Sequence, residues 1–282
     1  MKLCYLGTGA GFGIPEMFCS CRVCDNARQQ RGKDIRTRSQ AVIDDIISID
    51  FPVDAFLHSL YSGLDMRNIE HILITHNHFD HFMHQELFTR VQGVKGPCRL
   101  YLSEASGRTL LEAVEKRKED ERAGKRTKTT ELDLELNIIK PFVPFDISGY
   151  KITPLPARHA ANVEPVIFLI ESAGKTLLWA HDTGPLPDST LDYLGRQDLV
   201  IDFMSLDCTL ERGKCITSSH MDFEQCLETA ALLEEAGRSV KGKTRVMLSH
   251  IGHLTKLSHR EQVEEAVLYG IEVAYDGLTV VI

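Results

Sequence analysis

The stretch that decides the fold is His76-Asn77-His78-Phe79-Asp80-His81, which directly follows the short β-branched run at residues 71–75 (HILIT). A lone histidine usually belongs to the core or the surface, whereas clustered His and Asp residues after a predicted strand indicate a metal site. So tight a loop can direct two side chains at one cation and two at a neighbouring cation. Its four potential ligands are His76, His78, Asp80 and His81.

Three other predicted strands are each followed by a histidine or an aspartate. GYKITPLPAR runs to His159, KTLLWA (175–180) is followed by His181-Asp182, and TRVMLS (244–249) is followed by His250. Open α/β sheets place their ligands beyond the carboxyl ends of strands. Together with the hexapeptide, His159, Asp182 and His250 make seven ligands, which suits two divalent ions about 3.5–4 Å apart with a bridging carboxylate. His and Asp ligands are compatible with Zn or Mn, and also with Fe or Ni.

The pattern of these residues resembles that of a known superfamily. THNHFDH matches the His-x-His-x-Asp-His signature of the metallo-β-lactamase fold hydrolases, and the later order of AHDTG and LSHIGH is similar as well. The resemblance implies an α/β fold, a four-layer αββα sandwich with a binuclear metal site along one edge of the sheets. It implies that the first metal is held by His76, His78 and His159, the second by Asp80, His81 and His250, with Asp182 bridging them and Asp80 also counted as catalytic.

The segment GTGAGFGIPEMFCSCRVC (7–24) resembles the glycine loop and Cys-x-Cys-x-x-Cys segment of the phosphoribosyl 1,2-cyclic phosphate phosphodiesterases, and the closing IEVAYDGLTVVI (271–282) resembles the end of that family. In that group three cysteines and a late histidine hold a structural zinc. The matching positions in this chain are Cys19, Cys21, Cys24 and His253.

The chemistry of these ligands supports the same expectation. Three thiolates within six residues can wrap one Zn²⁺, but a closed tetrahedral set needs a fourth ligand from a distant part of the chain. His253 follows the candidate ligand His250 by three residues, so one turn can anchor both metal sites. The alternatives for the fourth ligand are Cys208, Cys215 and Cys226.

His220, in TSSHMDF, remains after the seven ligands are assigned. Hydrolysis of a phosphodiester leaves an alkoxide that needs a proton, and a histidine is suited to donate it. In the resembling family a histidine in this place is the proposed general acid, and the resemblance implies that role for His220. Arg158, Ser218 and Ser219 are candidates for gripping phosphate oxygens.

Composition limits the function classes. The chain has 282 residues, 32 Lys+Arg and 40 Asp+Glu, for a formal net charge of −8, which argues against a general nucleic-acid binder. There is no apolar run of the roughly 20 residues that a membrane span needs, and the start does not read as a signal peptide, so we expect a cytoplasmic protein. We expect no nucleic-acid or membrane partner, and whether the chain forms a homodimer stays open.

Strands alternate with helices and no linker interrupts them, which predicts one domain over 1–282 with a charged, helical insertion at about 104–135. Helices are expected at 53–64, 82–91, 222–236 and 259–268. Strands are expected at 2–6, 71–75, 98–102 and 197–204, a buried strand or hairpin at 41–50, and two short strands around Asp276-Gly277.

The resulting functional expectation is a metal-dependent phosphodiesterase that hydrolyses a small or cyclic phosphodiester through a metal-bound hydroxide. One alternative keeps the fold but changes the substrate to a tRNA 3′ end, a lactam, a lactone or a thioester. Another is a non-catalytic carrier from cofactor biosynthesis, which the seven intact ligands argue against.

Overall fold

Two mixed β-sheets lie face to face in the computed structural model of the chain, which describes residues 1–88, 90, 96–125, 134–214 and 216–282. Within these residues each sheet has seven strands. The first sheet has the order β14 (Thr279–Val281), β1 (Lys2–Gly7), β2 (Gln40–Ile43), β3 (Ile47–Ile49), β4 (His71–Leu73), β5 (Cys98–Leu102) and β6 (Leu134–Ile138). The second has the order β13 (Glu272–Val273), β12 (Arg245–Ser249), β11 (Phe203–Asp207), β10 (Lys175–Ala180), β9 (Val166–Ser172), β8 (Tyr150–Pro156) and β7 (Phe145–Ile147).

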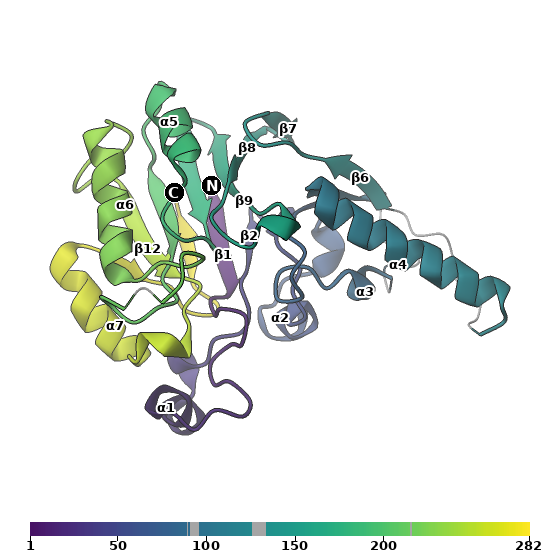
Figure 1. Cartoon of the computed structure of the whole chain (residues 1–282), viewed down its shortest axis with the longest axis horizontal. Coiled ribbons are helices and arrows are strands. Elements are labelled where there is room, and N and C mark those ends of the chain that lie inside the picture. Colours follow the sequence, from purple (N-terminus) through teal and green to yellow (C-terminus); the bar gives the residue numbers. More distant parts are fainter. Residues whose placement is uncertain (89, 91–95, 126–133, 215) are drawn as a thin grey trace.

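Helices cover the outer face of each sheet, so the chain forms four layers, as Figure 1 shows. On the side of the first sheet lie α2 (Ala55–Tyr61), α3 (His84–Leu87) and α4 (Glu104–Arg122). On the side of the second sheet lie α5 (Asp188–Arg196), α6 (Phe223–Glu235) and α7 (His259–Ala266), and α1 (Arg22–Gln30) packs into the same core cluster. Short 3₁₀ turns occupy Gly32–Asp34, Met66–Asn68, Ala161–Val163, His253–Thr255 and Val267–Tyr269. The predicted αββα sandwich is confirmed.

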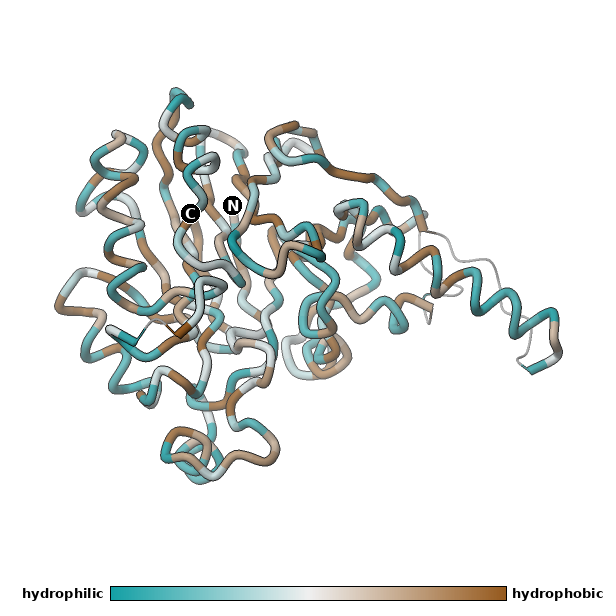
Figure 2. The backbone as a smooth tube through the Cα atoms, viewed as in Figure 1, coloured by the Kyte–Doolittle hydropathy of each residue, from teal (hydrophilic) through white to brown (hydrophobic). Residues whose placement is uncertain are grey.

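Apolar side chains fill the space between the sheets and under each helical layer. The central cluster includes Trp179, Phe168 and Phe203, which are fully buried between the two sheets. Separate clusters lie beneath the helices of each outer layer. Figure 2 shows hydrophobic backbone positions along the strands and mostly hydrophilic ones along the outer half of α4. No described helix is long and apolar enough to cross a membrane.

The central strands of both sheets run parallel, and this places the site. Strands β3, β4, β5 and β6 pair in parallel, as do β10, β11, β12 and β13. The carboxyl ends of parallel strands meet at one edge, where the connecting loops collect their functional side chains. The loops that carry the hexapeptide, Asp182 and His250 leave β4, β10 and β12 at such ends. His159 follows β8, which pairs antiparallel with β9 but runs in the same direction as β10, so its carboxyl end lies at the same edge.

The buried run 41–50, predicted as a strand or a hairpin, is the hairpin of β2 and β3. Several other element predictions need correction. The helix predicted at 53–64 is the shorter α2. The helix predicted at 82–91 is described only as α3, because residues 89 and 91 lie outside the described residues. The strand predicted at 197–204 is wrong: residues 197–202 connect α5 to the sheet, and β11 begins only at Phe203. Arg238 explains the difference, since its guanidinium donates to the carbonyl oxygens of Gln197 and Leu199, which therefore need no neighbouring strand.

The charged segment contains the predicted helix. Helix α4 begins at the cap residue Ser103, whose side chain accepts a hydrogen bond from the N–H of Ser106, and it extends away from the sheets (Figure 1). Strand β6 then returns to pair with β5. Residues 126–133 of the predicted insertion lie outside the described residues, and the single-domain organisation stays a prediction.

Candidate metal centre

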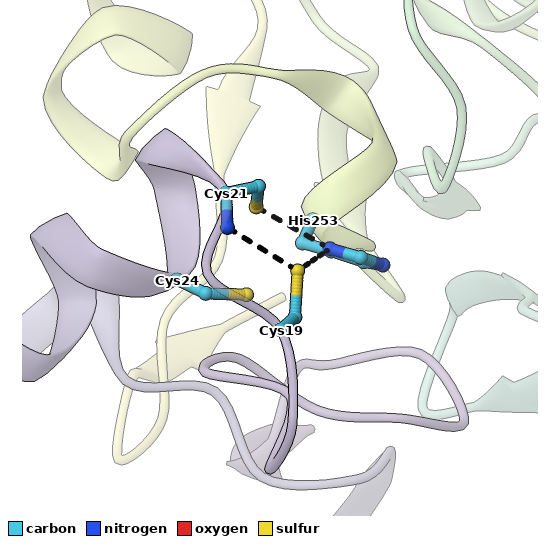
Figure 3. A group of neighbouring side chains, drawn as sticks. All are labelled: Cys19, Cys21, Cys24 and His253. Carbon is cyan, nitrogen blue, oxygen red and sulfur yellow. Dashed lines mark hydrogen bonds between the residues drawn. The ribbon is translucent and has the colours of Figure 1, made fainter.

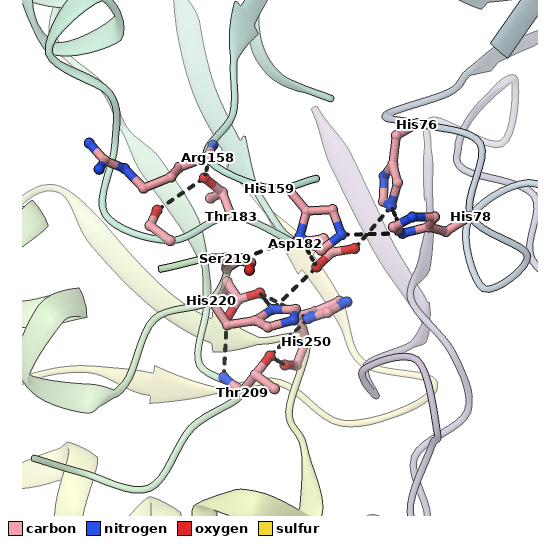
Figure 4. Close-up of polar contacts among 12 residues, drawn as sticks. His76, His78, Arg158, His159, Asp182, Thr183, Thr209, Ser219, His220 and His250 are labelled. Atoms are coloured by element: carbon pink, nitrogen blue, oxygen red, sulfur yellow. Dashed lines mark hydrogen bonds and ion pairs between the residues drawn. The ribbon is translucent and has the colours of Figure 1, made fainter. Parts of the chain in front are cut away.

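The seven predicted ligands come together at one edge of the two sheets, in two groups that share Asp182. Figure 4 shows five of them, His76, His78, His159, Asp182 and His250. The hexapeptide follows β4, and the other three ligands follow β8, β10 and β12. Within each group all ligand atoms lie within 4.8 Å of one another. The first group is His76, His78, His159 and Asp182, and the second is Asp80, His81, Asp182 and His250.

In the first group three imidazole nitrogens and a carboxylate oxygen face a common point. His76 Nε2 lies 3.0 Å from His78 Nδ1, and His159 Nε2 lies 3.2 Å from the same Nδ1. His76 Nε2 is 3.1 Å from Asp182 Oδ2. Ligands placed about 2.0–2.1 Å from one zinc in a tetrahedron stand about 3.3 Å from each other. The observed separations therefore fit a shared cation.

The second group has the same spacing and is almost fully buried. His81 Nε2 lies 3.2 Å from Asp182 Oδ2 and 3.4 Å from Asp80 Oδ2. His81 Nε2, Asp182 Oδ1 and His250 Nε2 are buried and have no hydrogen-bond partner among the described residues. Buried polar atoms without a partner are costly, and a divalent cation would satisfy these three. The residues present therefore fit a pair of divalent ions.

Two carboxylates that the sequence analysis missed orient the histidine ligands. Asp50, which directly follows β3, accepts from His81 Nδ1 at 2.7 Å and from the Thr75 N–H at 2.8 Å. Asp207, the last residue of β11, lies 2.9 Å from His250 Nδ1 through its Oδ2. A carboxylate that contacts the Nδ1 of a histidine fixes the orientation of the ring and leaves its Nε2 free to bind a metal ion.

The backbone at this edge is held in an unusual conformation. Asp50, Asp182 and His250 have φ angles of 63°, 53° and 52°, in the left-handed region that non-glycine residues seldom occupy. Such conformations cost of order 1–3 kcal/mol each and concentrate at functional sites. In each case the turn directs a strand-end side chain back toward the ligand groups.

His220 lies beside the shared carboxylate (Figure 4). Its Nδ1 is 3.1 Å from Asp207 Oδ2 and 3.2 Å from Asp182 Oδ1. The loop that carries it packs tightly, because a Cβ on Gly184 would lie 1.8 Å from the Ser218 carbonyl oxygen. The structure also groups His220 with Asp182, Asp207 and His250, so position alone leaves both a ligand and a proton donor open.

The charges of the cluster shift the acidities of its members. Burial lowers the pKa of His220, but Asp207 and Asp182 outweigh burial and raise it to about 9. Burial raises the pKa of Asp182, yet the surrounding histidines hold it well below its usual range. Burial lowers the pKa of His81, and the neighbouring Asp50 and Asp80 raise it well above the ordinary histidine value. A metal bound to His81 must therefore displace a proton, which makes loading pH-dependent.

The candidate structural zinc site lies on the other side of the turn after His250 (Figure 3). Cys19 Sγ and Cys21 Sγ lie 3.3 and 3.5 Å from His253 Nδ1, and Cys24 completes the group. His253 Nε2 is 3.1 Å from Glu16 Oε2, which leaves Nδ1 as the nitrogen that faces the thiols. The structure thus brings together the four predicted residues.

The acidity of the Cys21 thiol favours its thiolate form. Burial raises the pKa of Cys21, but hydrogen bonds from the Cys24 backbone and from His253 outweigh it and lower the pKa to about 6. Of the alternative fourth ligands, Cys208 and Cys226 lie in the apolar cluster beneath α6 and α7, and Cys215 is outside the described residues. His253 is therefore the fourth member that the geometry favours.

A cleft of about 620 Å³ opens over the ligand groups. His78, Asp80, His159, Asp182, His220 and His250 all line it. Of the residues considered for gripping phosphate, Arg158 does not line it: its Nε donates to the Pro185 carbonyl oxygen, and Figure 4 shows the guanidinium turned away from the histidines. The Ser219 carbonyl oxygen lies 3.4 Å from His159 Nδ1.

Comparisons with known proteins agree with this geometry. Residues 48–251 match a family described as Beta-lactamase superfamily domain. A curated octanoyltransferase from Porphyromonas gingivalis (strain ATCC BAA-308 / W83) is 26% identical over 304 aligned residues, with 100% of this chain and 52% of the relative covered. The chain thus spans about half the length of the curated relative it matches, and that relative's activity does not transfer to it.

Solved structures show the same fold at low sequence identity. A diphosphatase from the PhnP family superimposes with a TM-score of 0.72 at 22% identity, covering 99% of this chain and 96% of the other. Zn²⁺-bound PqqB from Methylobacterium extorquens gives 0.72 at 21% identity, with 100% of both chains covered. Human tRNase Z, short form, gives 0.69 at 17% identity, with 100% and 99% covered. The three differ in their described roles, so they establish the architecture and leave the substrate open.

Proposed function

Because the chain belongs to the Beta-lactamase superfamily domain family, we propose that it is a binuclear metal-dependent hydrolase acting on a small or cyclic phosphodiester. The observation that carries the proposal is the pair of ligand groups that share the buried Asp182 beneath an open cleft, with His220 beside them. The likeness of residues 7–24 to the phosphoribosyl 1,2-cyclic phosphate phosphodiesterases supports the choice of a phosphodiester.

The residues of each group would hold one divalent ion, zinc or manganese, with Asp182 between the two. Such ions supply Lewis-acid stabilisation of phosphoryl oxygens and a water molecule of lowered pKa. Asp50 and Asp207 keep the rings of His81 and His250 in place, so the site is organised before substrate arrives.

We assign the proton transfer to His220. Its Nδ1 is hydrogen-bonded to Asp207 and lies 3.2 Å from Asp182 Oδ1, and the residue lines the cleft, which leaves Nε2 to donate a proton to the departing alkoxide. Burial lowers the pKa of the ring, but the Asp207 carboxylate raises it, which favours the protonated form that a general acid needs. The neighbouring carboxylates then stabilise the charged ring until the proton leaves.

The cysteine group is proposed to hold a structural zinc. Cys₃His is a closed ligand set that leaves no position for substrate, and it ties the segment before α1 to the turn that also carries His250. Its function is to fix the geometry of that turn.

The test is hydrolysis by protein reconstituted with zinc or manganese. We expect turnover of bis(p-nitrophenyl) phosphate, with chromogenic lactam and thioester substrates at least about 100-fold slower in kcat/KM. Asp182→Asn should lose the activity, and Asp192→Asn, on the exposed face of α5, should retain it. Faster cleavage of the lactam or thioester would assign the chain to another hydrolase class. Two bound metals without turnover of any substrate would favour the carrier.

A further inference from the structure

Two phenylalanine rings stand exposed in the cleft beside the ligand groups. Phe12, in the glycine loop, is 67% exposed, and Phe79, inside the ligand hexapeptide, is 53% exposed, and both line the cleft. Leu210 and Leu254 add further apolar surface to its walls. Large apolar groups are normally removed from water, so two rings beside reactive groups indicate a surface that a ligand covers.

The two segments that carry these rings are held against each other. A Cβ on Gly11 would lie 2.9 Å from Asp80 Oδ2, so the glycine loop passes directly over the hexapeptide. Arg38 links them as well: its Nε donates to the Gly11 carbonyl oxygen at 3.0 Å, and its guanidinium lies 5.7 Å from the centre of the Phe79 ring. This arrangement holds the backbone of the glycine loop and the Phe79 ring together at the mouth of the site.

Apart from its histidines, the described residues that line the cleft offer no cation for a second anionic group, because none of them is a lysine or an arginine. The nearby Arg38 is already paired with Asp54, 3.1 Å away, and that pair is largely buried. Glu16 adds a carboxylate to the lining, next to His253. A ligand with a terminal phosphate would meet no partner for it here beyond the metal groups.

We propose that Phe12 and Phe79 form a subsite for a flat, uncharged aromatic ring carried by the phosphodiester. The substrate would then have no second phosphate, and in this it would differ from the phosphoribosyl compound that the resemblance of residues 7–24 implies. This inference rests on the proposed function and names the class of substrate: a phosphodiester next to a nucleobase or an aryl group. Stacking on aromatic side chains would position the ring while the phosphodiester lies over the ligand groups.

The test uses four substrates that share a 2′,3′-cyclic phosphate and differ in the other groups attached to the ribose. The metal-reconstituted protein is given the 2′,3′-cyclic phosphates of methyl riboside, phenyl riboside and adenosine, and adenosine 2′,3′-cyclic phosphate with an added 5′-phosphate. We expect kcat/KM about 10-fold or more higher for the phenyl and adenine compounds than for the methyl compound, with no gain from the 5′-phosphate. Equal rates for methyl and aromatic compounds, or a 10-fold gain from the 5′-phosphate, would overturn the proposal.

Substitutions assign the preference to the two rings. Phe12→Ala and Phe79→Ala should each reduce the aromatic preference severalfold, mainly by raising KM, because stacking on a non-reacting group contributes equally to ground and transition states. Phe56→Ala, which removes a ring that is 61% exposed on α2 and outside the cleft, is the matched control and should change nothing. Phe79→Leu keeps an apolar side chain but removes the flat ring. Measuring the metal content of this variant shows whether the adjacent ligands have been disturbed. An unchanged preference in the Phe12 and Phe79 variants would reject the subsite.

A binding measurement keeps the two proposals distinguishable. In saturation-transfer difference NMR with adenosine 3′-phosphate, the wild-type protein should saturate the adenine protons, and the Phe12→Ala/Phe79→Ala protein should not. If no phosphodiester is cleaved but this difference is seen, the proposed function fails and the subsite stands. If phosphodiesters are cleaved and the difference is missing, the subsite fails alone.

Discussion

At the scale of single residues, one carboxylate serves two histidines with different proposed tasks. Asp207 Oδ2 lies 2.9 Å from the Nδ1 of His250 and 3.1 Å from that of His220. The first ring is a candidate metal ligand and the second a candidate proton donor. Because both depend on the same oxygen, only a measurement that separates metal content from turnover can tell their roles apart.

His220→Ala provides that separation. If His220 is the general acid, the variant should keep all its metals but turn over about 10²–10⁴-fold more slowly on a phosphodiester with a poor alkoxide leaving group. The loss should shrink for p-nitrophenolate, which departs without a proton. His84→Ala, on α3 outside the cleft, is the control. Loss of a metal ion would make His220 a ligand, and an equal loss on both substrates would point to positioning instead.

Asp182→Ala tests the shared carboxylate. Asp182 contributes an oxygen to both ligand groups, so its removal should weaken both ions together and abolish hydrolysis. Metal analysis after dialysis should find the cysteine-bound zinc retained and both active-site ions depleted. Asp80→Ala belongs to the second group only, and it should deplete one ion more than the other while also abolishing hydrolysis. Normal metal content and rate in the Asp182 variant would remove it from the site.

At the scale of elements, the loop before α1 and the 3₁₀ turn at His253–Thr255 face each other at the cysteine group. Glu16 Oε2 lies 3.1 Å from His253 Nε2, and Arg22 donates to the Lys256 carbonyl oxygen. Arg22 also pairs with Glu261 of α7, but that pair is largely exposed and contributes little. The proposed zinc, bound to all four residues of the group, would add the strongest link at this junction.

Cys21→Ser should accordingly lose one zinc per chain and lower the midpoint of thermal unfolding, while the two active-site ions remain. Cys4→Ser, in β1 and outside the ligand groups, should keep all three metals. Metal analysis and calorimetry on the two variants make the comparison. Full zinc content and unchanged stability in Cys21→Ser would disprove the structural zinc.

Sequence patterns predicted the helices and strands whose hydrophobic period follows from one buried face. They failed where contacts with distant parts of the chain set the bounds of an element. Asp182 and His250 were found because the carboxyl ends of parallel strands lie at one edge. His159 was found because it follows a predicted strand, β8, which runs in the same direction as β10. Asp50 ends a predicted strand in the same way and was accessible to that rule, whereas Asp207 was hidden because the strand was placed at 197–204. Its true position depends on Arg238, a contact between residues some 40 positions apart that no local pattern contains.

The exposure of Phe12 and Phe79 was likewise beyond the sequence. An aromatic residue in a glycine loop or between two ligands has the same local signature whether it packs inward or faces solvent. Only the assembled edge of the two sheets shows both rings in one cleft.

At the scale of the whole molecule, buried polar groups stabilise the fold together with the apolar core, and one of them links α2 to β2 of the first sheet. His58 is 5% exposed, with Nδ1 donating to Gln40 Oε1 at 2.6 Å and Nε2 2.7 Å from Thr37 Oγ1. Burial lowers its pKa to about 4, although Asp54 acts in the opposite direction. The folded protein therefore keeps this ring neutral at a pH where the unfolded chain protonates it.

This difference in pKa between the folded and unfolded states makes the protein less stable at low pH. The stability from neutral His58 is fully present above the unfolded pKa of about 6.5 and is lost as the pH falls toward 4. Between pH 7.5 and 5 the loss is about 2 kcal/mol. Urea unfolding should show that His58→Gln, which cannot titrate, loses less stability over this range than the wild type by about that amount. Identical losses in the two proteins would show that His58 titrates alike in the folded and unfolded states.

The turn that carries His250 and His253 also sets the order of events during synthesis. The second ligand group and the cysteine group take ligands from early segments of the chain and are complete only once this turn has been made, whereas the first group is complete at Asp182. At about 5–20 residues per second, His76–His81 wait about 10–30 s for His250. Cations met by the nascent chain in that interval find the second group and the cysteine group incomplete. We therefore expect these two sites to take their resident ions only after the turn has been synthesised.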